Sequence, residues 1–259
     1  MSAVTYPVTV AVGSLPVTRV MLARVSGEEE AWLSPGRPGE ATRLLGALLR
    51  GSPLDPAALP VTVHDRLLAA VFRAEIGDTA RCRASCAVCK APFEFALTLD
   101  AVIAQQDAAA ASAAAETMDG DGRWHLDGLS IRAPTLGDAA SGDPDALLAA
   151  VCTPAPMPSQ RDAVIAFLDR AAPVLTLDLD ARCPSCDAAQ QVEFDLPRFL
   201  VGALAVGRPL LIREAHLIAA RYGWSLAEIL AMPRDDRRAF ATLIESERSA
   251  ALRRGSGVA

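Results

Sequence analysis

The sequence predicts an α+β fold in which helices and short antiparallel β-hairpins are joined by a split pair of cysteine knuckles and followed by a helical C-terminal tail. Two Cys-x-x-Cys pairs lie far apart, at Cys86–Cys89 and Cys183–Cys186. Each pair is followed by a strand-like run that contains Glu-Phe. Each half of the chain therefore reads helix, strand, Cys-x-x-Cys, strand, an approximate internal repeat, and helical periodicity dominates after residue 200.

A Cys-x-x-Cys loop places two thiolates on one tight turn, which is half of a tetrahedral zinc site. We expect Cys86, Cys89, Cys183 and Cys186 to form one structural Zn²⁺ site, because four thiolates leave no open position for catalysis. Buried or redox-active thiols and disulfides are the alternative interpretations of the same spacing. Cys82 lies four residues before the first pair and is an alternative ligand.

The distance between the knuckles along the chain favours a structural role. Joining Cys89 to Cys183 closes a loop of roughly 94 residues, at a cost of about 4 kcal/mol of chain entropy. Structural zinc contributes an apparent ~10–16 kcal/mol in small peptides, and a whole domain is stable by only ~5–15 kcal/mol. These magnitudes predict that the metal decides whether the two halves stay joined.

Composition limits the functional classes. The chain has 259 residues, of which 51% are hydrophobic, so it can build a sizeable core. Its net charge of −6 disfavours a general polyanion-binding protein, although residues 208–254 carry nine arginines against six carboxylates. No secretion signal or membrane-spanning run is expected, and Cys-x-x-Cys pairs without such a signal indicate a reducing cytoplasm.

Four segments follow from these patterns: an N-terminal α+β half with the first knuckle at 1–104, an alanine-rich linker at 105–123, a second α+β half with the second knuckle at 124–200, and a helical tail at 201–259. In the first half, strands are expected at 8–12 and 17–25, helices at 26–33, 40–50 and 62–76, and a strand at 93–99. Thr62 with Asp65 is the expected helix cap, His64 the expected surface residue, and Glu28–Glu30 an expected solvated helix start.

The second half contains a hairpin around Asp127-Gly128, a helix at 143–151 ending at a core residue, Cys152, and a helix at 160–172 with Ser159 as its cap. Strands are expected at 175–180 and 192–196. The alanine-rich stretch has few large apolar residues, so we expect a mobile helical linker there.

The tail is expected to form helices at 210–222, 226–232 and 234–254, with Gly223 as a left-handed cap, Ser225 in a capping box, and Phe240, Leu243 and Ile244 facing inward. We expect a partner-binding surface here, because aromatic residues often anchor interfaces. Its candidate residues are Tyr222, Trp224, Leu226 and Ile229. The alternative is that Trp224 only packs the tail's own helices together. His216 is expected to be a packed or surface residue and not a ligand.

The tail run from Arg213 to Leu217, the Tyr222–Ser225 tetrapeptide and the segments Val63–Leu68 and Arg132–Thr135 resemble the baseplate proteins of contractile phage tails. This is the family of the T-even phage baseplate hub assembly chaperone, with relatives in contractile injection systems. Family knuckles often read Cys-Pro-x-Cys-Gly, whereas this chain has Lys90 and Asp187 in the glycine positions.

The resemblance implies a non-enzymatic structural or assembly protein, located in the cytoplasm or in an assembled phage tail-like particle. Its implied partners are other baseplate or tail proteins, with no membrane, no small-molecule substrate and no expected nucleic acid. No hydrolase, metalloprotease, Walker or dinucleotide motif is found. A zinc-ribbon/helix-turn-helix nucleic-acid-binding protein and a thiol oxidoreductase are the competing hypotheses.

Overall fold

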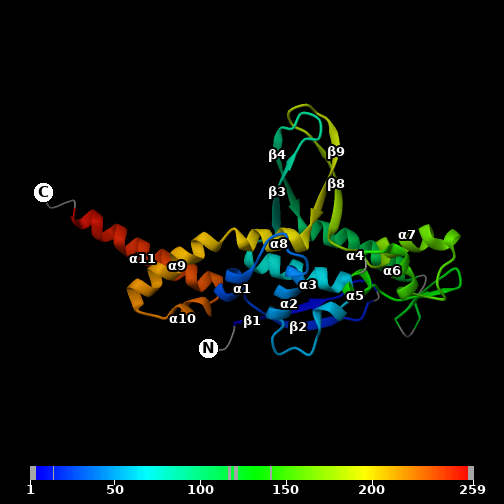
Figure 1. Cartoon of the computed structure of the whole chain (residues 1–259), viewed down its shortest axis with the longest axis horizontal. Coiled ribbons are helices and arrows are strands. Elements are labelled where there is room, and N and C mark those ends of the chain that lie inside the picture. The colour runs from blue at the N-terminus through cyan, green and yellow to red at the C-terminus, as the bar shows by residue number, and fades with distance from the viewer. Residues whose placement is uncertain (1–3, 14, 116–117, 120–121, 141, 256–259) are drawn as a thin grey trace.

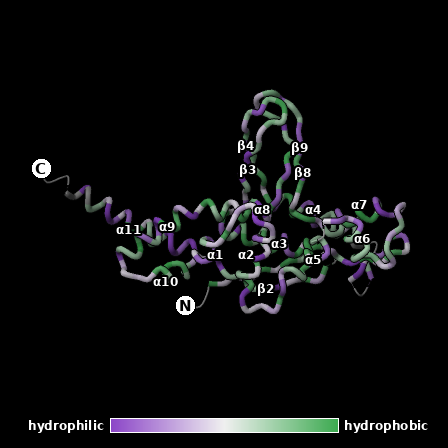
Figure 2. The backbone as a smooth tube through the Cα atoms, in the orientation of Figure 1, coloured by the Kyte–Doolittle hydropathy of each residue, from purple (hydrophilic) through white to green (hydrophobic). Residues whose placement is uncertain are grey.

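The computed structural model describes residues 4–13, 15–115, 118–119, 122–140 and 142–255. It is a mixed α/β structure with small antiparallel sheets, as the α+β prediction requires. Figure 1 shows a central body, two hairpins that rise from it side by side, and a helical tail that extends to one end. Hydrophobic residues run through the helices of the body, whereas the last helix of the tail is largely hydrophilic (Figure 2).

The N-terminal part of the body combines one hairpin with three α-helices. Strands β1 (Thr5–Val10) and β2 (Thr18–Ala23) pair antiparallel, and they precede α1 (Gly27–Trp32), α2 (Glu40–Leu48), the 3₁₀ helix η1 (Pro56–Ala58) and α3 (Val61–Glu75). Ser26 forms a capping box with Glu29 at the start of α1. Helix α3 is the centre of the body, since leucine, valine and phenylalanine side chains are buried along its length.

The expected cap of α3 is wrong. The helix begins one residue earlier, after Pro60, and Thr62 makes no capping hydrogen bond. The Asp65 carboxylate instead accepts a hydrogen bond from the Leu175 backbone N–H at 2.7 Å, and its other oxygen lies 3.2 Å from His64 Nδ1. His64 is only 2% exposed, not a surface residue, because Asp65 and Thr42 satisfy both of its ring nitrogens.

Two long hairpins rise from the body (Figure 1). The first pairs β3 (Thr79–Ser85) with β4 (Pro92–Thr98), and the second pairs β8 (Thr176–Arg182) with β9 (Ala189–Asp195). Both ladders contain seven residue pairs in register. Their bases are anchored in the core by residues such as Ala80 and Phe194, whereas the outer rungs are largely exposed.

The alanine-rich stretch is helical to residue 115 and packs against the body at Ala110 and Ala113. Helix α4 (Leu99–Ala115) lies against α7 (Arg161–Ala171), and Ala110 is fully buried. A Cβ atom at Gly13 would lie 3.0 Å from the Ala110 carbonyl oxygen, so the loop after β1 approaches this helix closely. Asp107 forms an ion pair with Arg66 at 2.8 Å. The expected helix is therefore present and contacts the body over this part, while residues 116–117 and 120–121 lie outside the described chain.

The second half adds a small sheet and several short helices. Strands β5 (Trp124–Leu126), β6 (Leu129–Ile131) and β7 (Cys152–Thr153) form an antiparallel sheet, with Asp127 and Gly128 at positive φ in the predicted turn. Around the sheet lie α5 (Leu136–Ala139), α6 (Pro144–Val151), the 3₁₀ helix η2 (Pro158–Gln160) and α7 (Arg161–Ala171). Ser159 does not cap α7, because η2 leads directly into that helix.

One hydrophobic core joins both halves. It extends continuously from Val10 to Leu204 and includes α8 (Leu196–Ala205), which contacts α2 and α3. None of the four knuckle cysteines belongs to this core cluster. Buried side chains therefore already join the two halves, which favours a body that stays folded without a metal.

The tail has a separate, smaller core. It consists of α9 (Arg208–Tyr222), α10 (Leu226–Leu230) and α11 (Arg234–Gly255), which surround Ile218, Ile229 and Ile244. Gly223 ends α9 in the left-handed conformation and Ser225 forms the predicted capping box. Leu243 was expected to face inward but is 48% exposed, since α11 buries only a narrow face.

Buried charges join the tail to the body. Glu30 of α1 contacts Arg234 at 2.8 Å and also pairs with Arg237, which contacts Glu214 at 2.7 Å. Arg237 is 1% exposed. Burial raises the pKa of Glu30, although both arginines oppose that shift. Glu29 is buried as well, so the expected solvated helix start is wrong for two of its three glutamates.

Within the described residues, no helix combines the length and the apolar character needed to cross a membrane.

Candidate metal centre

The two cysteine pairs meet at the tips of the hairpins (Figure 1). Cys86 and Cys89 lie in the turn between β3 and β4, and Cys183 and Cys186 lie in the turn between β8 and β9. All four sulfur atoms lie within 4.8 Å of one another. The Cys86 and Cys186 sulfurs are 3.6 Å apart, and those of Cys89 and Cys183 are 3.7 Å apart. These distances are too long for disulfides and are compatible with a shared metal ion.

Each knuckle turn is built by the same local hydrogen bonds. The Lys90 N–H donates to the Cys86 carbonyl oxygen, and the Asp187 N–H donates equivalently to the Cys183 carbonyl oxygen. Lys90 and Asp187 adopt φ values of 62° and 57°, the left-handed conformation that glycine favours. Both non-glycine residues therefore form the turn that the family pattern assigns to glycine.

Backbone N–H groups point at the first sulfur of each pair. Cys86 Sγ accepts from the N–H groups of Val88 and Cys89, at 3.4 and 3.5 Å, and Cys183 Sγ accepts from Ser185 at 3.4 Å. Both first cysteines are buried, and both second cysteines are exposed. The two knuckles are therefore built alike, and their sulfur atoms converge on one position.

Gln190 connects the knuckles directly. Its side-chain oxygen, on β9, accepts a hydrogen bond from the Ala87 backbone N–H at 2.8 Å. The sequence analysis did not identify this residue, because a glutamine in an exposed strand carries no signal of its cross-hairpin contact.

The thiols compete for ionisation. The Cys89 N–H, followed by the Val88 N–H, lowers the pKa of Cys86 to about 6. The Ala188 N–H favours the thiolate of Cys186, but contacts with the neighbouring thiols outweigh it and raise the pKa of Cys186 to about 12. Four adjacent thiolates repel one another, and a bound cation removes that repulsion.

The two remaining cysteines lie elsewhere. Cys82 is buried in the ladder of the first hairpin, and Cys152 is buried in β7, where it pairs with Ile131. Burial raises the pKa of both thiols. Among the residues that the structure describes, only the four knuckle cysteines form a cluster that could hold an ion. Cys152 therefore has the expected core position, and the alternative ligand Cys82 lies outside the cluster.

The candidate partner surface in the tail is only partly exposed. Tyr222 stacks on Trp224 with ring centroids 5.0 Å apart, and Trp224 meets Phe240 edge-on at 5.3 Å. Leu226 is 60% exposed, whereas Ile229 is fully buried in the tail core. Ile229 therefore cannot contact a partner directly, and Trp224 does pack the tail helices together, while His216 is exposed.

No protein-family model, no curated protein and no solved structure matches this chain.

Proposed function

We propose that the four cysteines bind one structural Zn²⁺ ion. In a tetrahedral zinc site with Zn–S bonds of about 2.3 Å, neighbouring sulfurs lie about 3.8 Å apart. The sulfur separations of 3.6 and 3.7 Å are close to this value. Four protein ligands fill the coordination shell, so the ion stabilises the fold and provides no position for a substrate.

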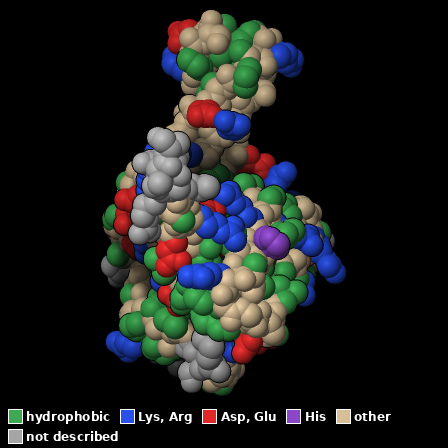
Figure 3. Space-filling view, turned by 90° about the vertical axis from the view of Figure 1, so that its left-hand side faces the viewer, with side chains coloured by type: hydrophobic (Ala, Val, Ile, Leu, Met, Phe, Trp, Pro, Cys, Tyr) green, Lys and Arg blue, Asp and Glu red, His purple; other side chains and the backbone are tan. Residues whose placement is uncertain are grey.

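We propose further that the chain is a non-enzymatic structural or assembly protein that acts through protein–protein contacts. The observation that carries this proposal is the location of the thiol cluster. It lies at the tip of two hairpins that project beyond the body as a narrow column (Figures 1 and 3). A metal ion that fixes such a projection maintains its shape for a partner to recognise.

On the basis of the sequence resemblance, we propose that the chain acts in the baseplate of a contractile tail or injection system. Tyr222, Trp224 and Leu226 remain the proposed contact residues in the tail. Leu226 has the largest exposed fraction of the three side chains and lies next to a stacked aromatic pair. Tyrosine and tryptophan are the residue types that most often anchor protein interfaces, and the stacked pair of Tyr222 and Trp224 supplies both.

Nucleic-acid binding receives less support. Arginine and acidic side chains lie next to one another on the tail end of the molecule (Figure 3). Arg213 and Arg221 form ion pairs with Glu245 and Glu247, and the arginines at the body junction are paired with carboxylates. Arginines neutralised within the protein contribute little to phosphate binding.

Metal analysis of protein purified under reducing conditions tests the first part. We expect one zinc per chain, and about none in a Cys86→Ser/Cys183→Ser variant. The Cys152→Ala variant is the matched control, because it removes a buried thiol outside the cluster and should retain the zinc. Full-length protein with four reactive thiols and no metal would contradict the proposal.

Co-purification with candidate baseplate proteins tests the second part. Leu226→Asp should weaken the complex, whereas Leu243→Asp, an exposed change on the same tail, should not. Equal co-purification of both variants would exclude the tail surface. Salt-sensitive binding to DNA or RNA without any protein partner would favour the nucleic-acid alternative.

A further inference from the structure

Among the residues that the structure describes, strand β8 has a hydrogen-bonded neighbour strand on only one side. It pairs with β9 alone, and the Leu196 N–H donates to the Leu175 carbonyl oxygen at the start of this ladder. Backbone groups of an antiparallel strand point alternately to its two sides. Those of Val174, Thr176 and Asp178 therefore face away from β9, toward a free edge.

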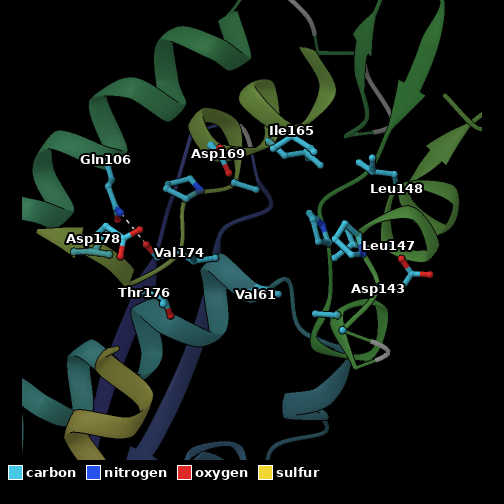
Figure 4. Close-up of a pocket in the computed structure, with 18 residues that line it drawn as sticks. Val61, Gln106, Asp143, Leu147, Leu148, Ile165, Asp169, Val174, Thr176 and Asp178 are labelled. Carbon is cyan, nitrogen blue, oxygen red and sulfur yellow. Dashed lines mark hydrogen bonds between the residues drawn. The ribbon is translucent and has the colours of Figure 1, made fainter. Parts of the chain in front are cut away.

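A side chain already occupies the first position of this edge. Gln106 Nε2, on α4, donates to the Val174 carbonyl oxygen at 2.8 Å (Figure 4). Gln106 Oε1 in turn accepts from Arg66 Nη2 at 3.0 Å, which fixes the orientation of the amide. This contact lies at the wall of a pocket, so the free edge of β8 faces that pocket.

The pocket is apolar and has a volume of 690 Å³. Leu147 and Leu148 of α6 and Ile165 of α7 lie across it from Val174 and Thr176 (Figure 4). Leu147 and Ile165 are partly exposed, so a bound group can reach them. The space is large enough for one or two large apolar side chains.

The charge around the pocket is entirely negative. Its charged lining residues are Asp143, Asp169 and Asp178, and no lysine, arginine or histidine lines it. Asp169 and Asp178 are exposed and form no ion pair within the described residues. Asp178 also lies directly opposite Glu193 in the ladder, and like charges in that position are unfavourable. A cation bound at this edge would relieve the repulsion.

We propose that the free edge of β8 and the adjoining pocket bind an extended segment of a partner protein, in which large apolar residues alternate with lysine or arginine. The segment adds a strand to β8, its apolar side chains enter the pocket, and its basic side chains meet the aspartates. A fatty acyl ligand fits less well, because its carboxylate would meet the aspartates.

This inference rests on the proposed function, because it supplies a specific surface for the protein–protein contacts. The two are separable. Co-purification of the Leu226→Asp variant tests the tail surface of the proposed function. Peptide binding tests the β8 edge, which lies in the body, and needs no baseplate protein.

The test is selection from a displayed library of random octapeptides on the full-length protein. We expect enriched peptides to alternate large apolar with basic residues. The same peptides, synthesised with a fluorescent label, should bind about tenfold more weakly to Asp178→Lys, by anisotropy. Asp162→Lys is the matched control, because it makes the same charge change on α7 outside the pocket lining and should leave binding within about twofold.

A second readout does not depend on variants. Strand addition should slow hydrogen exchange of the Thr176 and Asp178 amides in the unsubstituted protein, and N-methylation of alternate peptide amides should abolish binding. Any of four results would overturn the inference. The selection could enrich no peptide or only acidic peptides, Leu147→Asp could leave peptide binding unchanged, or hydrogen exchange at β8 could stay unchanged. Unchanged melting temperatures of the variants establish that they fold.

Discussion

Removal of the metal should loosen the hairpin tips and leave the body folded. The perturbation is chelation of the purified protein under reducing conditions. The core from Val10 to Leu204 includes none of the four ligands, so its packing does not require the ion. The outer rungs of the hairpins have no such support, since their side chains are mostly exposed and each hairpin has only two strands.

The magnitude follows from the stability of a free hairpin. A two-stranded hairpin alone is marginal in water, with a local stability of about 1 kcal/mol or less, which protects its amides less than about tenfold from hydrogen exchange. The proposed zinc site, with a contribution of ~10 kcal/mol, would prevent this opening. Chelation should therefore accelerate exchange in the outer rungs by at least about 1,000-fold.

Hydrogen exchange measured by mass spectrometry resolves the two regions. Peptides from residues 83–93 and 181–191 should lose protection, whereas those around Trp124, which is fully buried against Phe167, should keep it. The melting temperature should fall, because a metal that binds only the native state stabilises it by linkage. Cooperative loss of protection throughout the body, or tips that stay protected without metal, would refute the reasoning.

Three other perturbations have defined outcomes. Arg237→Ala leaves two buried carboxylates without their shared cation, so urea unfolding should show a loss of about 3–5 kcal/mol, and a loss below about 1 kcal/mol would show that water compensates the charges. Asp138→Asn removes the negative charge and one of the two carboxylate oxygens that accept from Arg132, at 2.6 and 2.7 Å, and the cost should be about 1–3 kcal/mol near neutral pH. Because Arg132 holds the folded-state pKa of Asp138 below its unfolded value, its stabilisation is present above the unfolded pKa and is lost as the pH falls through the folded pKa, so the cost of the variant should vanish in acid urea titrations. Gly223→Ala places a side chain at φ 71° with open space around it, so thermal unfolding of the tail should show a cost of about 1 kcal/mol, and no cost would mean that the left-handed cap relaxes.

Local signals in the sequence predicted most of the architecture. The Cys-x-x-Cys spacing, the alternation in the hairpins and the Asp127-Gly128 turn each depend on neighbouring residues, and the structure contains all three. The proximity of the two knuckles was also predictable, because two half-sites of matched design require each other.

Features that depend on long-range packing were not predictable in this way. In the sequence, His64 and Glu30 look like ordinary solvent-exposed polar residues. Their burial is explained by partners that are distant in the sequence, Thr42 for His64 and Arg234 for Glu30. The alanine-rich helix lacks large side chains, yet Ala110 packs because the Gly13 loop approaches it closely. The free edge of β8 likewise depends on which strands do not pair, which a single sequence does not specify.

The junction between α1 and the tail has a mechanical consequence. Gly27 donates to the Met232 carbonyl oxygen, Arg234 donates to that of Val25, and a Cβ atom at Gly27 would lie 2.9 Å from Leu230. Such close backbone contact leaves no room for the tail to swing about this point. A force applied at the hairpin tips would therefore move the body and the tail together.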